Sequence, residues 1–454
     1  MTDVDVVVVG LGPGGEAAAN KLAGAGLDVV AVDKGLVGGE CPSFGCIPSK
    51  MMIRAAHSLA ESGRVAVLAG ESTTTPAWTP VADRIRDEAT DDWDDTAAVK
   101  RLEDHGARVV RGLGRLTGER TIEVDGETFT ARRAVVVNTG TDPMVPPIEG
   151  LAETPYWTNR DVVRTTELPG SLVLIGGGAI GCELAQALTR FGVRVTVVEG
   201  LDRILANEEP ETSALVASVF AREGIRVMTG NQVESVGYAD GQFTVRVGDE
   251  TLTADKLLVA AGRTLNILDL GLDTVGVDPK ARSVETDDRL HVVAGDGPVD
   301  WLYAVGDITG KGAFTHMSMY QSGIVVDTIL NRGGPAADYR AVPRVTFTDP
   351  EVGSVGMTEK QARDAGLDVG TGSVGLDDTT RGWIHKIGNE GFIKLVAADG
   401  ALVGATSVGP MGGEVISMLT TAVHARVPVS DLKSMIYAYP TFHGAVRQAL
   451  DDLG

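Results

Sequence analysis

The sequence predicts an α/β fold with two Rossmann-like domains and a C-terminal α+β domain. One observation is a strand, a glycine-rich turn, a helix, a second strand and an acidic residue, which follow one another between residues 3 and 33. The second is a repeat of this order that begins at Gly176, 166 residues after Gly10. The third is the segment beyond residue 341, where strands and helices continue without a glycine fingerprint.

The first repeat has the features of a dinucleotide-binding unit. Residues 3–9 are predicted to form a buried parallel strand, residues 16–25 a helix and residues 27–32 the second strand. The glycines of the turn permit a close approach of the backbone to a pyrophosphate, which the helix N-terminus attracts. Asp33 ends the second strand, where its carboxylate can accept hydrogen bonds from ribose hydroxyls.

The second repeat predicts a second nucleotide. The glycines from Gly176 to Gly181 lead into a helix, and the next strand, residues 193–198, ends at Glu199. Glu199 would accept from both ribose hydroxyls of NAD and repel a 2′-phosphate, so we expect NADH to be preferred. Arg203 lies close by and could partly accommodate that phosphate, which leaves NADPH as the alternative.

Charge and hydropathy exclude several classes of partner. The chain has 62 acidic and 40 basic residues, a net charge of -22, which argues against nucleic acid and against anionic membrane surfaces. No uninterrupted apolar run reaches the ~18 residues of a membrane span. The N-terminus leads directly into the first strand without a signal-peptide pattern, so we expect a cytoplasmic protein.

The segment GGECPSFGCIPSK, residues 38–50, contains two of the three cysteines. Cys41 and Cys46 are five positions apart, and five steps of an ideal helix turn about 500°, which would place them on different faces. Two prolines and a glycine within the segment argue against an ideal helix, and a loosened turn could bring the sulfurs within bonding distance. The spacing alone fits a redox pair and a pair of buried small hydrophobic residues equally well. Cys182, at the start of the second repeat's helix, is interpreted as a packing residue.

The other segments carry no assigned chemistry. The cysteine segment is predicted to open a helix through residue 59, and the acidic stretch of residues 81–105 is predicted to be helical and solvated. The remaining predicted elements are a helix at 316–330, strands at 345–348, 391–397 and 401–408, and helices at 414–424 and 429–435. The apolar faces of these last elements suit a subunit interface.

Taken together, the motifs resemble those of the FAD-dependent pyridine nucleotide-disulfide oxidoreductases. VVVVGLGPGG is similar to the family's FAD fingerprint, NTGTDP to its second FAD contact, and LIGGGAIGCE to its nicotinamide-nucleotide fingerprint. GGECPSFGCIPSK resembles the redox-disulfide motif, and YAVGD the motif whose acid, here Asp307, holds the flavin ribityl chain. FTDPEVGSVGMTE resembles the start of the dimerisation domain.

This resemblance implies a homodimeric flavoprotein enzyme that acts on a small-molecule acceptor. It implies a discontinuous FAD-binding domain at residues 1–148 and 272–340, an NAD(P)-binding domain at 149–271 and a dimerisation domain at 341–454. In the implied mechanism NADH delivers hydride to the flavin N5, the flavin passes electrons through C4a to Cys46, and Cys41 is the interchange thiol. Lys50 would lie near the flavin N5 and pair with Glu183.

The resemblance also implies a set of cofactor-binding residues and no metal site. These are Gly10, Gly12, Gly14, Gly15, Asp33, Lys34, Gly39, Glu40, Lys50, Thr139, Gly140, Gly176, Gly178, Ile180, Gly181, Glu199, Gly262, Arg263, Gly306, Asp307, Ala313, Phe314, Thr315 and His316.

The C-terminal tail departs from the family pattern. Where disulfide reductases carry a His and a Glu that act as acid and base for the thiols, this chain has Tyr439 and Gly444. A tyrosine pKa of about 10 is too high for an efficient base near pH 7. His443 follows Tyr439 by four residues, and on a helix the two could share a face. Both are candidate catalytic residues, and we do not expect an efficient dihydrolipoamide dehydrogenase.

Two further functions remain as alternatives. One is a quinone or dye reductase, or a soluble transhydrogenase, whose acceptor takes electrons from the flavin directly. The other is a redox-sensing flavoprotein whose disulfide changes its binding of a partner.

Overall fold

The computed structural model of the protein describes residues 1–295 and 297–453, and its chain divides into two units. The first unit contains Met1–Pro48, Asp83–Pro143 and Arg263–Tyr339. The second contains Ser49–Ala82, Met144–Gly262 and Arg340–Gly454. The predicted nucleotide repeats therefore fall into different units.

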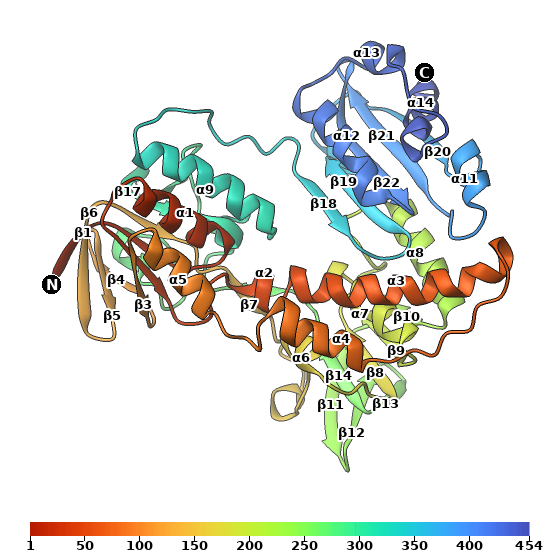
Figure 1. The fold of residues 1–454 in the computed structure, drawn as a ribbon, viewed down its shortest axis with the longest axis horizontal. Helices are drawn as coiled ribbons and strands as arrows, with labels where there is room; N and C mark the ends of the chain where they lie inside the picture. The colour runs from red at the N-terminus through yellow and green to blue at the C-terminus, as the bar shows by residue number, and fades with distance from the viewer. Residues whose placement is uncertain (296, 454) are drawn as a thin grey trace. The chain divides into compact units, whose positions relative to one another are not determined.

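A mostly parallel sheet forms the centre of the first unit (Figure 1). Its strand order is β16-β17-β6-β1-β2-β3, and β16 pairs antiparallel at one edge. The bounds are β1 Thr2–Val9, β2 Val29–Asp33, β3 Ala107–Arg111, β6 Glu127–Val137, β16 His291–Ala294 and β17 Gly297–Ala304. Strands β4 (Arg115–Gly118) and β5 (Thr121–Val124) continue from β6, and β7 (Thr141–Pro143) pairs with β15 (Arg263–Leu265). The apolar runs Val6–Val9 of β1 and Val29–Val32 of β2 are buried throughout, as expected for strands covered on both faces.

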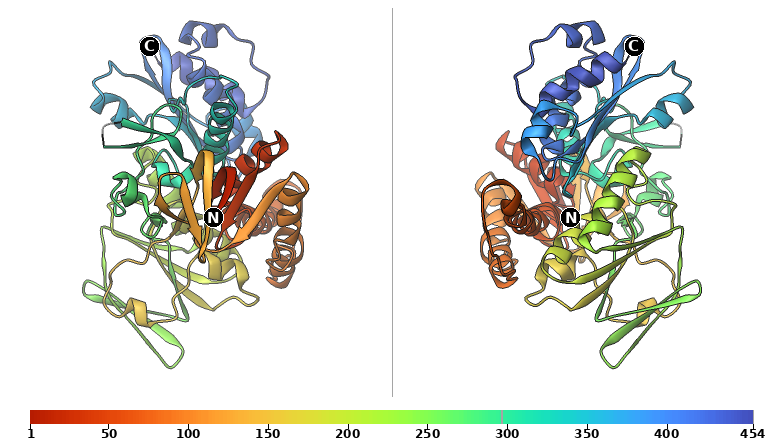
Figure 2. Two further views of the ribbon diagram at one scale, coloured as in Figure 1. Left: turned by 90° about the vertical axis from the view of Figure 1, so that its left-hand side faces the viewer. Right: turned by 90° about the vertical axis from the view of Figure 1, so that its right-hand side faces the viewer.

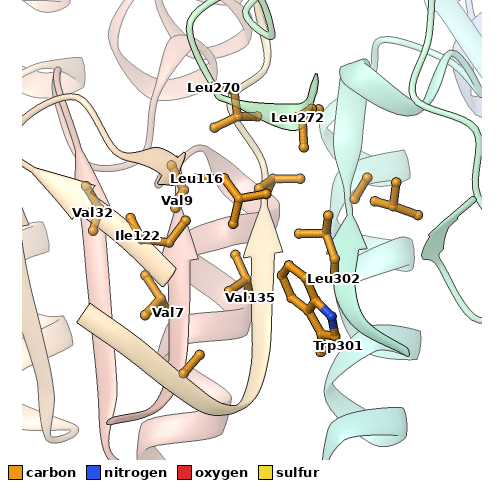
Figure 3. Packing of buried hydrophobic residues seen from close by; sticks show 14 of the residues in the cluster. Val7, Val9, Val32, Leu116, Ile122, Val135, Leu270, Leu272, Trp301 and Leu302 are labelled. Carbon is orange, nitrogen blue, oxygen red and sulfur yellow. The ribbon is translucent and has the colours of Figure 1, made fainter. Parts of the chain in front are cut away.

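Both faces of this sheet are covered. Helices α1 (Pro13–Gly24), α5 (Thr96–Asp104) and α9 (Thr315–Ile329) contribute apolar side chains to the core on one face. On the other face β4, β5 and the loop around Leu270 and Leu272 pack on the sheet, as Figure 3 shows for Leu116, Ile122 and their neighbours. The carboxyl ends of β1 and β2 are left to carry the glycine turn and Asp33.

The cysteine segment forms two helices instead of one. Helix α2 spans Glu40–Ser43, and α3 spans Cys46–Leu68. Phe44 and Gly45 interrupt the helical path, and the helix predicted to follow the cysteines is confirmed.

The prediction of one helix over the acidic residues 81–105 is wrong. Helix α4 (Thr79–Arg84) passes into a π-helical turn, Ile85–Ala89, and α5 begins only at Thr96. The Thr90 hydroxyl donates to the carbonyl oxygens of Ile85 and Arg86, which competes with regular helical bonding. The three residues Asp91, Asp92 and Trp93 then adopt positive φ of 47°, 53° and 59°.

The second unit contains the second repeat. Its parallel sheet has the order β10-β9-β8-β14. The strands β11, β12 and β13, which lie between β10 and β14 in the sequence, form a separate antiparallel sheet. The bounds are β8 Ser171–Ile175, β9 Arg194–Glu199, β10 Arg226–Thr229, β11 Val233–Ala239, β12 Gln242–Val247, β13 Glu250–Ala254 and β14 Lys256–Val259. The helices are α6 Asn159–Arg164, α7 Ala179–Arg190 and α8 Pro210–Glu223.

An antiparallel sheet of order β18-β19-β22-β21-β20 forms the C-terminal part of the second unit. Figure 2 shows this segment, in blue, as a single body of sheet and helices. The strands are β18 Pro343–Thr346, β19 Glu351–Gly356, β20 Gly370–Gly375, β21 Phe392–Ala398 and β22 Ala401–Gly409. The helices are α10 Glu359–Asp364, α11 Thr380–His385, α12 Gly412–His424, α13 Val429–Ser434 and α14 Phe442–Asp452. Residues from α12 and α14 share a core with β21 and β22, which produces the predicted α+β character.

A buried ion-pair network joins three segments of the second unit. Arg190 and Arg64 donate to Asp349 Oδ2 over 2.8 Å and 2.6 Å, and the Asp349 side chain is 11% exposed. Burial alone would raise the pKa of Asp349, but the two guanidinium groups outweigh it and hold that pKa below its ordinary value.

We predict that Asp349→Asn destabilises the protein by about 3 kcal/mol at pH 7, because it leaves two half-neutralised buried arginines. Since the pKa of Asp349 is lowered in the folded state, its stabilisation is present above the ordinary carboxyl pKa of 3.8 and is lost as the pH falls through the folded value. The difference between the urea midpoints of wild type and variant should therefore be full at pH 7 and shrink as the pH falls below about 4.

Asp364→Asn is the control, because Asp364 belongs to an exposed pair with Lys360 and its loss should cost under about 1 kcal/mol. If the urea midpoint of Asp349→Asn equals that of Asp364→Asn, the ion-pair network does not stabilise the folded protein.

Candidate active site

The two glycine turns have the same geometry. Gly10 has φ of 92° and Gly176 has φ of 111°, in the region that favours glycine. A Cβ on Gly10 would lie 2.4 Å from the carbonyl oxygen of Asn138, and one on Gly176 would lie 2.4 Å from that of Ala260. Each turn therefore lies directly against the residue that follows a strand paired with the first strand of its module, β6 in the first unit and β14 in the second.

The helix N-termini behind these turns are open to a ligand. A Cβ on Gly15 would lie 1.9 Å from the Gly10 carbonyl oxygen, so only a glycine here lets the glycine turn pack against the start of α1. A Cβ on Gly12 would meet only Asn138 Nδ2 at 3.1 Å, and one on Gly178 would meet nothing within 4 Å. A pyrophosphate can therefore approach the backbone at the start of α1 and of α7, as the fingerprint requires. Gly181 repeats the role of Gly15, with its Cβ position 2.0 Å from the Gly176 carbonyl oxygen.

Asp33 and Glu199 are held by equivalent backbone amides. The N–H groups of Leu11 and Gly177 donate to Asp33 Oδ2 and Glu199 Oε2, each over 2.6 Å. The other carboxylate oxygens accept from Gly35 N–H over 2.6 Å and from Leu201 N–H over 2.8 Å. Both acids are thus fixed at the end of the second strand of their module, where an adenosine ribose would lie.

Further predicted FAD residues of the first unit are linked by hydrogen bonds. Thr141 donates to Asp307 Oδ2 over 2.7 Å, and Arg263 Nη2 donates to the Thr141 carbonyl oxygen over 2.7 Å. Thr139 Oγ1 is buried and has no hydrogen-bond partner among residues 1–295 and 297–453. Together with the open glycine turn, this group of polar atoms fits a bound FAD, which the residues of the first unit would hold.

Other predicted contacts fall at the edges of this group. Glu40 lies 3.7 Å from Arg263, and Lys34 lies 3.9 Å from Asp142. Of the remaining predicted residues of the first unit, Gly14 lies in the first turn of α1 and Gly306 in the 3₁₀ helix Gly306–Thr309. The others lie in the loops before α2 and after β6 or at the start of α9: Gly39, Gly140, Ala313, Phe314 and His316. Gly262 belongs to the second unit and follows β14, and Ile180, near the start of α7, is 39% exposed.

The sequence analysis missed Asn138 and Ser318. The buried Ser318 hydroxyl donates to Asn138 Oδ1 over 2.9 Å and lies against Gly14. This contact joins the start of α1, the end of β6 and α9. The residue Asn138 opens the NTGTDP motif, so the motif contained the signal, whereas a serine within a helix gave none.

Cys46 lies at the N-termini of two helices. It is the first residue of α3, and its Sγ is 3.5 Å from the Oγ1 of Thr315, the first residue of α9. Helix N-termini carry a partial positive charge that favours a thiolate. Cys46 is exposed and Cys41, within α2, is half-buried. The position of Cys46 is therefore suited to carry negative charge.

The turn between the cysteines is tight at Gly45. A Cβ there would lie 3.0 Å from the Glu40 carbonyl oxygen and 3.5 Å from the Cys41 Cα. The Phe44 N–H donates to the same carbonyl over 2.9 Å, which ends α2. The break in the helix therefore turns the chain back toward Cys41 before α3 begins.

Lys50 and Glu183 form an ion pair in the second unit. Lys50 Nζ donates to Glu183 Oε2 over 2.7 Å, and the Phe347 N–H donates to Glu183 Oε1 over 2.8 Å. Lys50 Nζ also lies 4.7 Å from the centroid of the Phe347 ring. The carboxylate is 7% exposed, whereas the lysine is 34% exposed, so the buried partner orients the accessible one.

Cys182 is a packing residue, as predicted. It is fully buried, and its Sγ donates to the Gly177 carbonyl oxygen over 3.3 Å. Burial raises the pKa of the Cys182 thiol well above its ordinary value, which keeps it protonated and unreactive.

Tyr439 and His443 do not share a helical face, which corrects the prediction. Helix α14 begins at Phe442, because Thr441 caps it by accepting from the Gly444 N–H over 3.1 Å. Tyr439 precedes this cap, is 80% exposed, and its Oη lies 3.2 Å from Thr380 Oγ1. His443 lies in the first turn of α14.

Comparison with known proteins decides the family. The family model described as pyridine nucleotide-disulphide oxidoreductase matches residues 4–322, and the model of its dimerisation domain matches residues 342–450. The chain belongs to this family. The chain is 32% identical to a mercuric reductase of Acidithiobacillus ferrooxidans, over 98% of its own length and 82% of that protein. It is 33% identical to a dihydrolipoyl dehydrogenase of Mycobacterium leprae, over 100% and 98% of the two chains.

Solved structures agree with this assignment. The HOCl-induced flavoprotein disulfide reductase RclA from Escherichia coli, solved as a Cu(II) complex, matches with a TM-score of 0.86 and 25% identity over 99% of both chains. LpdA from Mycobacterium tuberculosis matches with a TM-score of 0.85 and 26% identity over 100% of both chains.

The family assignment confirms the predicted fold class and the expectation of an enzyme. Its members support an NAD(P)H-dependent, FAD-containing disulfide oxidoreductase with a C-terminal dimerisation domain. Among the described residues, no helix combines the length and the apolarity needed to cross a membrane.

We predict that Thr315→Val slows alkylation of Cys46 at pH 7 about three- to tenfold, the equivalent of one hydrogen bond to the reactive thiolate. The measurement is the iodoacetamide reaction of the reduced protein, followed by mass spectrometry of the Cys46 peptide. Thr328→Val is the control, because the Thr328 hydroxyl donates to Ile324 O further along α9. Equal rates for wild type and Thr315→Val would exclude the contact from thiolate stabilisation.

Proposed function

We propose that the protein is an NADH-dependent flavoprotein reductase in which Cys41 and Cys46 form the redox pair and pass electrons to a small disulfide acceptor. The observation that supports this most directly is the position of Cys46 at the start of α3, with Thr315 at the start of α9 beside its sulfur. A structural cysteine would gain nothing from two helix N-termini, whereas a thiolate would be stabilised by both.

Reduction of the pair adds the equivalent of one hydride, two electrons and a proton, and breaks one S–S bond. FAD, when bound, supplies the two-electron relay between the nicotinamide and this bond. Two electrons and one proton convert the disulfide into a Cys41 thiol and a Cys46 thiolate. Cys41 must then lose its proton to attack the acceptor, because the thiolate is the nucleophile.

Lys50 and Glu183 would serve the electron-accepting step. A lysine cation near the isoalloxazine ring would stabilise the negative charge that reduction creates there. Glu183 positions this cation through the 2.7 Å ion pair and is itself fixed by the Phe347 N–H.

The loop after β9 supports NADH over NADPH. The Glu199 carboxylate is held at the ribose position by two backbone amides, where its charge would repel a 2′-phosphate. Arg203 is engaged elsewhere: its Nη2 donates to the carbonyl oxygens of Ala206 and Glu208 over 2.6 Å and 3.1 Å. We propose that this arginine does not recruit the phosphate of NADPH.

The tail favours a second candidate function. Tyr439 is exposed, and a phenol is a poor base for Cys41. Quinones, dyes and a second nucleotide take electrons directly from reduced flavin and need no thiol base. The names of the relatives include both a mercuric and a dihydrolipoyl substrate, so they do not select the acceptor.

We further propose a cytoplasmic homodimer, since the chain has a dimerisation domain and a cysteine pair that must be kept reducible.

We predict that anaerobic titration of the FAD-loaded protein with NADH produces a long-wavelength absorbance band after two electrons, because a Cys46 thiolate would then lie against oxidised flavin. Cys41→Ser and Cys46→Ser separate the candidate functions. Loss of acceptor reduction by more than about a hundredfold in both variants would support the disulfide route. Retained quinone or dye reduction, with no band in the wild type, would support the second function and overturn the first.

We predict that Glu199→Ala lowers kcat/KM for NADH about tenfold and raises the NADPH to NADH ratio of kcat/KM by more than this factor, because it removes both the ribose acceptor and the repulsion. Asp202→Asn removes the same charge three residues away and should leave the ratio within about twofold. An unchanged ratio in Glu199→Ala would remove the proposed basis of nucleotide preference.

A further inference from the structure

A tryptophan outside every predicted motif contacts the segment between the two cysteines. The indole N–H of Trp93 donates to the carbonyl oxygen of Ser43 over 3.0 Å, within the first unit. Ser43 lies between Cys41 and Cys46, and its side chain is buried. The bond joins parts of the chain that are 50 residues apart.

The carbonyl that accepts this bond lies where the helix is interrupted. Ser43 is the last residue of α2. The last carbonyl oxygens of a helix accept no hydrogen bond from the amides of that helix. Because Phe44 and Gly45 break the helical path, the bonding of α3 does not extend back to Ser43. Trp93 therefore supplies a donor at the point where the chain turns between the cysteines.

A second contact holds the other side of the cysteine segment. The Val37 N–H donates to Asp95 Oδ2 over 2.6 Å, and Arg111 donates to the same oxygen. The Asp95 side chain is 16% exposed. Val37 precedes the cysteine segment, so residues 91–95, which we name the Trp93 loop, hold this segment before and after Cys41.

The backbone of the Trp93 loop is itself unusual. It follows a π-helical turn, a feature frequent at functional sites. Asp91, Asp92 and Trp93 all have positive φ, a conformation that a bulky residue such as tryptophan rarely adopts. The loop is closed by the Asp92 N–H, which donates to the Arg86 carbonyl oxygen over 2.7 Å. Strain of this kind persists where the surrounding structure requires one particular placement.

We propose that Trp93 is a positioning residue for the cysteine pair and that it sets the equilibrium between the disulfide and the dithiol. The inference rests on the proposed function, because it requires Cys41 and Cys46 to be the redox pair. Trp93 acts through the Ser43 carbonyl, to which its indole N–H donates.

The physical basis is the geometry of the S–S bond. A disulfide needs its Cβ atoms about 3.5–4.5 Å apart, whereas two thiols have no such requirement. Cys41 and Cys46 are unbridged in the structure. A contact that holds the turn between them narrows the range of separations open to the two thiols, which lowers the entropic cost of closing the S–S bond and favours the oxidised form. Reduction breaks the S–S bond, takes up two electrons and one proton, and leaves one thiol and one thiolate. Removing the contact should therefore shift the equilibrium toward the dithiol.

The test compares wild type with Trp93→Phe, which keeps an aromatic ring and deletes the donor. FAD-loaded proteins are equilibrated anaerobically in glutathione redox buffers, quenched in acid and alkylated, and the fraction of bridged Cys41–Cys46 is measured by mass spectrometry. We expect the equilibrium of Trp93→Phe to lie at least about threefold further toward the dithiol, the effect of one hydrogen bond. Asp95→Ala, which deletes the acceptor for Val37, should shift it in the same direction and decides the matter if Trp93→Phe does not fold.

Trp78→Phe is the matched control. Trp78 is also mostly buried, and its indole N–H donates to a backbone carbonyl, that of Thr165, over 2.9 Å in the second unit. Its loss should leave the equilibrium unchanged. An unshifted or oppositely shifted equilibrium in folded Trp93→Phe, with a wild type that bridges normally, overturns this inference alone. A wild type whose two cysteines never bridge overturns the proposed function instead.

Discussion

Both nucleotide modules depend on the contact between a glycine turn and the end of a neighbouring strand. Gly10 meets the carbonyl of Asn138, and Gly176 meets that of Ala260, at distances that leave no room for a side chain. Because the turn is fixed there, the following helix begins beside an uncrowded glycine, Gly12 in one module and Gly178 in the other. The same turn offers the amide that holds Asp33 in one module and Glu199 in the other. Removal of this close approach would disturb pyrophosphate and ribose recognition together.

The fold was predictable where local pattern and global structure agree. The glycine spacing, the valine runs and the terminal acids identified both repeats, because close contacts admit few other residues. The acidic residues 81–105 were mispredicted, because helical composition gave no sign of the π-helical turn or of the left-handed residues at Asp91 to Trp93. Strands β19 and β20 were not predicted, since their glycines weaken the strand signal and only pairing with neighbouring strands shows them.

The candidate site was predictable only as far as motifs reach. The cysteine segment, Lys50 and Glu183 were found from the resemblance to a known family. Apart from Thr315 beside Cys46, the partners that hold them were not predicted. Trp93 belongs to no recognisable motif, and Phe347 opens the FTDPEVGSVGMTE motif, which gave no sign of its contact with Glu183. The four-residue spacing allowed Tyr439 and His443 to share a helical face, but spacing does not reveal a cap, and α14 begins after Thr441.

The second unit shows how closely its nucleotide module and its dimerisation domain are joined. The Phe347 amide fixes Glu183, and Gln186 exchanges two hydrogen bonds of 2.8 Å with the backbone of Asp349. Glu183 and Gln186 lie within α7, and the glycine turn precedes the N-terminus of this helix. For the exchange of segments between relatives, whether by natural recombination or by the construction of chimaeras, a crossover near residue 340 would therefore separate a side chain from the backbone that orients it. A chimaera that keeps residues 179–190 and 343–356 from the same parent would preserve this joint, so the heritable unit here is larger than either domain.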